Sequence, residues 1–185
     1  DLYIGTYKQC QKKWLKMFEI VENCISKSNQ NYIKQIMFGP QKNFPWYFAK
    51  DVSLSNNRKQ QRPALFHSFV LSKYNVNSDF FDMVKPIVKN KNVIQARSIL
   101  QLPLNEKLLK KDFDTPHIDS KDPHLVYLYY VVDSDGQTLF LKNKKVIKKI
   151  KPKQGRLVIF NGNIYHTAEQ PKKNKRCVIN FNVDI

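Results

Sequence analysis

Residues 124–140 read HLVYLYYVVDSDGQTLF, and the class of fold follows from this stretch. The run HLVYLYYVV consists mainly of aromatic and branched side chains, which favour strands. DSDG, residues 133–136, has the composition of a tight turn and precedes QTLFL, so it predicts a hairpin. Two strands joined in this way are typical of an antiparallel β-protein.

Short segments of the same kind surround this hairpin from Asn92 to the end of the chain. They are VIQARSILQL before it, and KVIKKIK, RLVIF, IYHTAE and RCVINFNV after it, with turns at KNK and at Pro152–Gly155. About seven or eight short strands at regular spacing predict a β-sandwich or barrel.

The first half of the chain has a different pattern. Apolar residues recur at helical spacing over residues 7–28 and again over 78–89, so we expect two helices that pack against one face of the β-structure. RPALFHSFVLS reads as an extended segment. The aromatic run FGPQKNFPWYFAKDV lines a cleft or fills the core. We therefore predict one domain, 1–185, that is mainly β with flanking helices: a helical, aromatic-rich support region (1–91) and a β core carrying the site (92–185).

Composition narrows the class of protein. With 42% hydrophobic and 12% aromatic residues the chain is globular, and it has neither a signal-type segment nor a run of roughly 18 apolar residues. Cys10, Cys24 and Cys177 form no C-x-x-C pair or even set, which indicates a reduced setting. We expect an intracellular protein without a membrane segment.

The net charge of +17 raises the hypothesis of nucleic-acid binding. Almost all of the excess is lysine in segments such as LKNKKVIKKIKPK, and lysine usually forms a solvated surface. Nucleic acid therefore stays open as a partner, without being favoured by charge alone.

The chemistry is concentrated in DTPHIDS, where His117 and Asp119 stand two residues apart. On an extended chain these side chains point to the same side, so both can bind one ion. His166, in NIYHTAE, is available as a third ligand. Two histidines and a carboxylate form the facial triad of non-haem Fe(II) oxygenases, which leaves coordination positions open. Ligand types alone do not exclude zinc or manganese.

Arg176 makes this constellation more specific. It lies ten residues after His166 and is the only arginine in its predicted strand. A guanidinium can bind a carboxylate through two parallel hydrogen bonds. By contrast, we expect His124, which opens a strand after Pro123, to lie outside the coordination sphere, and His67 to pack or hydrogen-bond.

The segments HID, YLYYVVDSDGQTLF, KPKQGRLVIFNGNIYH and KRCVINF together resemble the 2-oxoglutarate/Fe(II) oxygenases of the prolyl-4-hydroxylase-like branch, in particular its short viral members. The resemblance implies a double-stranded β-helix (jelly-roll, cupin-like) core. It implies His117, Asp119 and His166 as metal ligands and Arg176 as the residue that binds the far carboxylate of 2-oxoglutarate. Tyr130 and Thr138 are further candidates for the cosubstrate pocket, although Tyr127, Tyr129 and Tyr130 leave the strand register open.

The resemblance also implies a reaction. Fe(II), 2-oxoglutarate and O2 would support hydroxylation of a substrate C–H bond with release of succinate and CO2, and ascorbate is compatible as a reductant. A peptidyl prolyl or related protein substrate is favoured. One alternative is a nucleobase hydroxylase or demethylase that stacks a base on Trp46 or Tyr47. Another is a non-enzymatic, basic β-sandwich that binds nucleic acid. Oligomeric state is left open.

Overall fold

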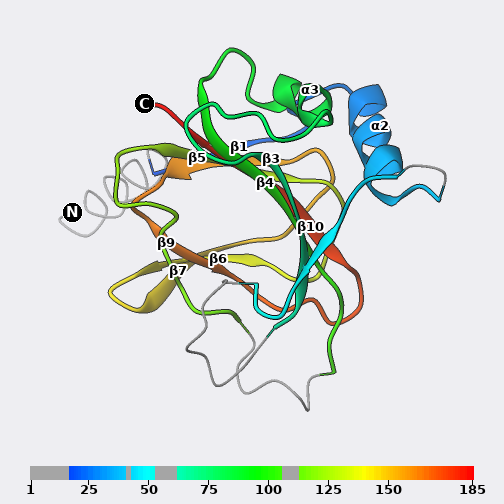
Figure 1. Cartoon of the computed structure of the whole chain (residues 1–185). Coiled ribbons are helices and arrows are strands. Elements are labelled where there is room, and N and C mark those ends of the chain that lie inside the picture. The colour runs from blue at the N-terminus through cyan, green and yellow to red at the C-terminus, as the bar shows by residue number, and fades with distance from the viewer. Residues whose placement is uncertain (1–16, 41–42, 53–61, 106–112) are drawn as a thin grey trace.

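The computed structural model describes residues 17–40, 43–52, 62–105 and 113–185 (Figure 1). Its strands are β1 (Phe18–Val21), β2 (Tyr47–Ala49), β3 (Ala64–Val70), β4 (Val93–Gln101), β5 (Leu125–Tyr130), β6 (Thr138–Lys142), β7 (Lys145–Ile150), β8 (Leu157–Asn161), β9 (Tyr165–Ala168) and β10 (Arg176–Val183). The helices in these ranges are α2 (Lys27–Phe38), the single turn α3 (Phe81–Val84) and the 3-10 turn η1 (Lys85–Ile87).

The strands form two antiparallel sheets. The large sheet has the order β1-β8-β5-β10-β4-β3-β2, and the small sheet has the order β7-β6-β9 (Figure 1). The chain crosses between the sheets from β5 to β6 and returns from β7 to β8. This arrangement is a jelly roll, and it confirms the predicted mainly β fold with flanking helices.

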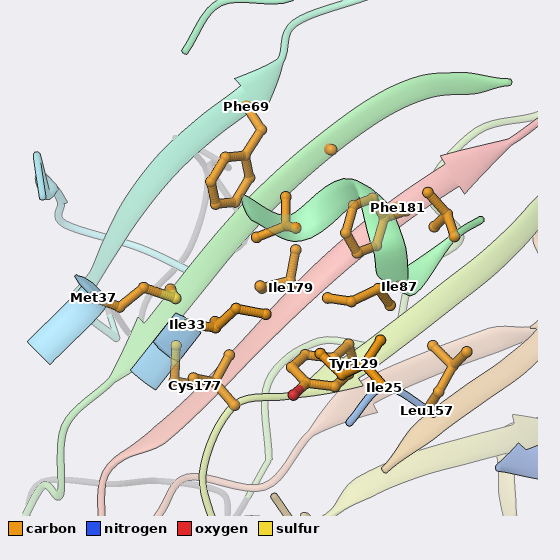
Figure 2. Close-up of a cluster of buried hydrophobic side chains, with 14 of the residues drawn as sticks. Ile25, Ile33, Met37, Phe69, Ile87, Tyr129, Leu157, Cys177, Ile179 and Phe181 are labelled. Atoms are coloured by element: carbon orange, nitrogen blue, oxygen red, sulfur yellow. The ribbon is translucent and has the colours of Figure 1, made fainter. Parts of the chain in front are cut away.

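One face of the large sheet is covered by the helices. Ile33 and Met37 of α2 pack against Cys177 and Ile179 of β10 (Figure 2). Ser26 starts α2 because its Oγ accepts a hydrogen bond from the backbone N–H of Asn29 (3.2 Å). The result is a dry apolar layer outside the two-sheet sandwich.

The opposite face of the large sheet looks toward the small sheet. Val126, Leu128 and Tyr130 of β5 and Val178 of β10 are buried there with Phe140 of β6. Side chains alternate along a strand, so the large sheet contributes to two separate cores, one on each face. The functional residues described below lie in the second of these layers.

The helix predicted over residues 7–28 is wrong over residues 17–26, because α2 begins only at Lys27. Residues 1–16 lie outside the described ranges, and Phe18–Val21 forms the edge strand β1, paired with β8 through Phe18 and Phe160. Phe18 also packs on Phe140, with ring centroids 4.5 Å apart. A free edge of the sheet and an aromatic partner therefore outweighed the helical spacing.

The helix predicted over residues 78–89 is much shorter. It reduces to α3 and η1, with Pro86 in the first turn of η1. Proline lacks the N–H of a continuing α-helix, which limits this segment to single turns. The region 1–91 also supplies three strands of the large sheet, so describing it as helical was incomplete.

The DSDG turn does not close a hairpin, because β5 and β6 belong to different sheets. The carboxylate of Asp135 instead accepts hydrogen bonds from the backbone N–H groups of Lys172, Lys173 and Asn174 at 2.9–3.1 Å. The turn thus anchors the loop that precedes β10. The KNK turn does join a hairpin, β6–β7, with Asn143 and Lys144 at positive φ as that tight connection requires.

Candidate metal centre

The segment that contains His117 runs beside β9. The backbone N–H of His117 donates to the carbonyl of His166, and the N–H of His166 donates to the carbonyl of His117, both at 3.0 Å. Residues paired in this way carry their side chains on the same face. The backbone pairing therefore holds the two imidazoles together, with ring centroids 4.8 Å apart.

Asp119 completes a group of three. Its Oδ1 lies 3.5 Å from Nε2 of His117 and 3.8 Å from Nε2 of His166. One nitrogen or oxygen atom from each residue lies within 4.8 Å of the others. Each imidazole uses Nδ1 to donate to a backbone carbonyl, Thr115 (3.3 Å) or Ile164 (3.0 Å). That leaves the Nε2 lone pair of each ring facing the carboxylate.

The carboxylate is arranged to accept a cation. The side chain of Asp119 is only 1% exposed. Its Oδ2 accepts a hydrogen bond from Nδ2 of Asn180 (2.8 Å), whereas Oδ1 is buried without a hydrogen-bond partner. A buried carboxylate oxygen that faces two imidazole lone pairs is satisfied by a metal ion. The residues thus fit a His/His/carboxylate metal site with the donor set of non-haem Fe(II) oxygenases.

The protonation states suit this role. Burial lowers the pKa of His166 to about 4, so the ring is neutral near pH 7. Burial alone would raise the pKa of Asp119, but the two imidazoles that face it, the Asn180 amide and the Arg97 guanidinium hold that pKa well below its usual value. Neutral imidazole and ionised carboxylate are the forms that bind metal.

Arg176 is buried in the same layer and is held on three sides. Its Nε donates to the carbonyl of Gly136 (3.1 Å), Nη1 to Oε1 of Gln101 (3.1 Å) and Nη2 to Oγ1 of Thr138 (2.9 Å). A Cβ on residue 136 would lie 2.8 Å from the backbone oxygen of Glu169 and 3.2 Å from Cδ of Arg176. Only glycine therefore lets the backbone at this position lie so close to Glu169 and Arg176. Each terminal nitrogen keeps one further N–H, which a carboxylate could accept.

A second row of residues supports Arg176. Nε2 of Gln101 donates to Oδ2 of Asp114 (3.1 Å), and Oδ1 of Asp114 lies 3.3 Å from Nε of Arg62. Burial raises the pKa of Asp114, against the lowering effect of the Arg62 and Arg176 charges. The orientation of Arg176 is thus fixed through a buried polar network.

Arg176 and the three-residue group line one cavity of about 300 Å³. Along β10, Arg176 and Asn180 lie on the same face, about 13 Å apart at roughly 3.3 Å per residue. Val178 lies between them, and Ile99 and Leu128 line the same cavity. A short dicarboxylate with an anionic group at each end fits between the guanidinium and the metal site.

The predicted pocket residues Tyr130 and Thr138 are connected. Tyr130 faces the layer between the sheets, which resolves the register among the strand tyrosines, and its hydroxyl donates to Oγ1 of Thr138 (2.7 Å). Thr138 lines the cavity, whereas Tyr130 lies behind it. Tyr129 points to the opposite, helix-covered core.

The other histidines lie elsewhere. His124 is buried against Gly162 and lines a separate hollow of about 490 Å³, so it stays outside the three-residue group as expected. The ring nitrogens of His67 hydrogen-bond the carbonyl of Pro45 and the hydroxyl of Ser78. Neither Trp46 nor Tyr47 lines the cavity; the Nε1 of Trp46 donates to the carbonyl of Met37.

Several polar residues of this site were not predicted from the sequence, among them Arg97, Gln101 and Asn180. The alternation of side chains along the strands could have identified them. Arg97 and Gln101 are four residues apart on one strand, as are Arg176 and Asn180 on another. Polar side chains that recur on one face of a strand buried on both faces indicate a polar cavity.

Comparisons with known proteins agree with this geometry. Residues 106–184 match the 2OG-Fe(II) oxygenase superfamily. A search of curated protein sequences found no significant match.

Solved structures show the same fold at low identity. An oxidoreductase of the 2OG-Fe(II) oxygenase family from Burkholderia pseudomallei has a TM-score of 0.63 and 9% identity, over 92% of this chain and 87% of that one. A Trichoplax adhaerens prolyl hydroxylase, solved with a hypoxia inducible factor peptide, has a TM-score of 0.62 and 14% identity over 93% and 86%. The viral collagen prolyl hydroxylase of Paramecium Bursaria Chlorella virus-1 has a TM-score of 0.57 and 12% identity, over 91% of this chain and 97% of that one. The predicted double-stranded β-helix is confirmed.

Proposed function

We propose that this chain, of which residues 106–184 match the 2OG-Fe(II) oxygenase superfamily, is a 2-oxoglutarate-dependent dioxygenase that hydroxylates a C–H bond of a peptide or protein, with a prolyl residue as the favoured target. The observation that carries the proposal is the lining of the cavity beside the candidate metal site. Apart from the two imidazoles its described lining is aliphatic or polar, with no Phe, Tyr or Trp. A lining without aromatic rings offers no surface on which a flat base could stack, so it favours a saturated target such as a prolyl ring.

The nucleobase alternative is less well supported. A base taken out of a duplex or single strand is normally stacked on aromatic side chains. Trp46 packs against Phe44, with ring centroids 5.0 Å apart, and Tyr47 is 65% exposed on β2. The stacking partners that this alternative needs are therefore missing from the described part of the cavity.

We assign His117, Asp119 and His166 as the ligands of Fe(II), and Arg176 as the residue that binds the far carboxylate of 2-oxoglutarate. When bound, Fe(II) supplies the oxidative decarboxylation of 2-oxoglutarate by O2, which yields succinate, CO2 and one oxygen atom for the substrate C–H bond. The protein supplies position. Asn180 turns Oδ1 of Asp119 toward the ion, and Thr138 and Gln101 orient Arg176.

The aliphatic side chains between the two ends of the cavity have a separate task. Ile99, Leu128 and Val178 exclude water from the space between Arg176 and the metal ligands. Exclusion of water strengthens the ion pair with the cosubstrate and limits side reactions.

The decisive experiment measures succinate release by the Fe(II)-loaded protein with proline-bearing peptides and, separately, with single-stranded oligonucleotides. A peptide should stimulate turnover at physiological ionic strength and gain one oxygen atom by mass spectrometry. The oligonucleotide should bind weakly and lose affinity steeply with salt, as cationic surfaces do. An oligonucleotide that stimulated turnover and gained a hydroxyl or lost a methyl would replace the peptide assignment with the nucleobase one.

The role of Arg176 has its own test. Arg176→Lys should weaken 2-oxoglutarate binding, and Arg176→Ala should weaken it further, by roughly ten- to a hundred-fold for the loss of a charged hydrogen-bonded pair. Calorimetric titration of the metal-loaded protein measures this. An unchanged cosubstrate affinity in Arg176→Ala would refute the assignment of that residue.

A further inference from the structure

The cavity contains a second guanidinium that the proposed reaction leaves unused. Arg97 lies on β4, two residues before Ile99 and four before Gln101, and lines the same cavity. Gln101 contacts Arg176, whereas Arg97 lies opposite Asn180 at the metal end. Its side chain is 24% exposed, so it stands where a substrate would enter.

The guanidinium of Arg97 has few partners for its hydrogen-bond donors. Its guanidinium has five N–H donors, yet among the described residues it donates no hydrogen bond, and its Nε is buried without a partner. The one ion pair that it makes within the described part of the chain is long, 3.7 Å from Nη2 to Oδ1 of Asp119. A buried donor without a partner costs free energy that a bound ligand can recover.

A metal ion bound between the three ligands would weaken that ion pair. Oδ1 of Asp119 is the oxygen that faces both imidazoles, and Oδ2 is already occupied by Asn180. An ion bound at Oδ1 would place a dication next to Arg97 in place of a bare carboxylate. Arg97 would then lack an anionic neighbour at the moment when substrate enters.

Resting on the proposed function, we infer that Arg97 binds a carboxylate of the substrate, so that the hydroxylated residue is adjacent to Asp or Glu in an acidic peptide. The position at the end of the cavity remote from Arg176 separates this carboxylate from the far carboxylate of 2-oxoglutarate. The net charge of +17 acts in the same direction, because it attracts acidic partners at long range. A peptide is favoured over nucleic acid because the described cavity lining has no Phe, Tyr or Trp on which a base could stack.

The test uses fluorescent proline-bearing peptides that differ only in the residue next to proline: Glu, Gln or Lys. Binding is measured by anisotropy with protein loaded with Zn(II) and 2-oxoglutarate, where no turnover occurs, and succinate release is measured with Fe(II). The proteins are the wild type, Arg97→Lys, Arg97→Gln and Arg97→Glu. Lys148→Gln, which removes the same charge from an exposed site on β7, is the matched control.

The wild type should bind the Glu peptide at least about tenfold more tightly than the Gln peptide. Arg97→Lys should keep part of this ratio, Arg97→Gln should lose it, and Arg97→Glu should prefer the Lys peptide, while Lys148→Gln should behave like the wild type. Because each ratio is measured within one protein, altered metal affinity at Asp119 cancels.

Three results would overturn the inference while leaving peptide hydroxylation intact. They are equal binding and turnover of all three peptides, an equal loss for all peptides in Arg97→Gln, and a loss confined to 2-oxoglutarate affinity. If no peptide bound or stimulated turnover, the proposed function would fail together with this assignment. Arg97-dependent turnover of an oligonucleotide would show that Arg97 binds a phosphate of a nucleic-acid substrate and not a carboxylate of a peptide.

Discussion

The two faces of β10 are equally buried but differ in chemistry. Cys177, Ile179, Phe181 and Val183 pack under the helices, whereas Arg176, Val178, Asn180 and Asn182 face the space between the sheets. Every residue of the strand is buried. Burial alone therefore does not distinguish core from site. The hydrogen-bonding demand of the side chains does, because a buried polar group must be paired or must receive a ligand.

The helix-covered face is chemically inert by comparison. Burial raises the pKa of the Cys177 thiol well above its usual range, so it does not form a thiolate near neutral pH. Asn180, three residues on and on the opposite face, orients a carboxylate instead. Substitutions on one face should alter stability, and those on the other should alter binding.

The largest effect is expected from the metal ligands. His117→Ala, which changes a side chain that is 43% exposed, should abolish Fe(II) binding and lower succinate formation by at least about a thousandfold while the protein stays folded. Asp119→Ala and His166→Ala should do the same. Metal titration and circular dichroism measure the two properties separately. His124→Ala is the control, and it should lower stability but keep metal binding; the reverse pattern would disprove the ligand set.

The helix-covered face should respond in stability. Phe181→Ala should destabilise the protein by about 3–5 kcal/mol, because it leaves a cavity in a close-packed core. Asn180→Ala, one residue away on the other face, should instead weaken metal affinity about ten- to a hundred-fold. Urea unfolding and metal titration of both variants check this. Loss of metal affinity in folded Phe181→Ala would show that the two faces are coupled.

Acid should affect the site face through His166. Burial lowers its pKa to about 4 in the folded protein, from 6.5 for an exposed histidine. Between these two pH values the unfolded chain therefore binds more protons than the folded protein. The metal-free protein should therefore lose stability as pH falls from about 6.5 to about 4, by at most about 3 kcal/mol. Urea midpoints across this range measure the loss. His166→Gln should flatten the dependence; an unchanged slope in that variant would assign it to other groups.

The smallest effect concerns the support of Arg176. Gln101→Met removes the acceptor for Nη1 of Arg176 and the donor to Asp114. The KM for 2-oxoglutarate should rise several-fold, in line with about 1 kcal/mol for one hydrogen bond, with kcat nearly unchanged. Steady-state kinetics separate the two parameters. A fall in kcat at constant KM would instead indicate an effect at the metal end.

The sequence alone determined the strands after residue 92 and brought attention to His117, Asp119, His166 and Arg176. Strands can be recognised from their composition and from alternating side chains. A histidine and a carboxylate at i and i+2 on an extended segment point to the same side. Arg176 was visible because it is an isolated arginine among lysines. These are local properties of the chain.

The tertiary structure alone decided the rest. Phe18–Val21 became a strand because the edge of β8 was available, and DSDG became a crossover between sheets because Asp135 is bound by the loop before β10. Arg97, Gln101 and Asn180 joined the site because strands β4 and β10 are neighbours. Pairing partners lie far apart in the chain, and register between them is set by packing of both sheet faces, which no local pattern encodes.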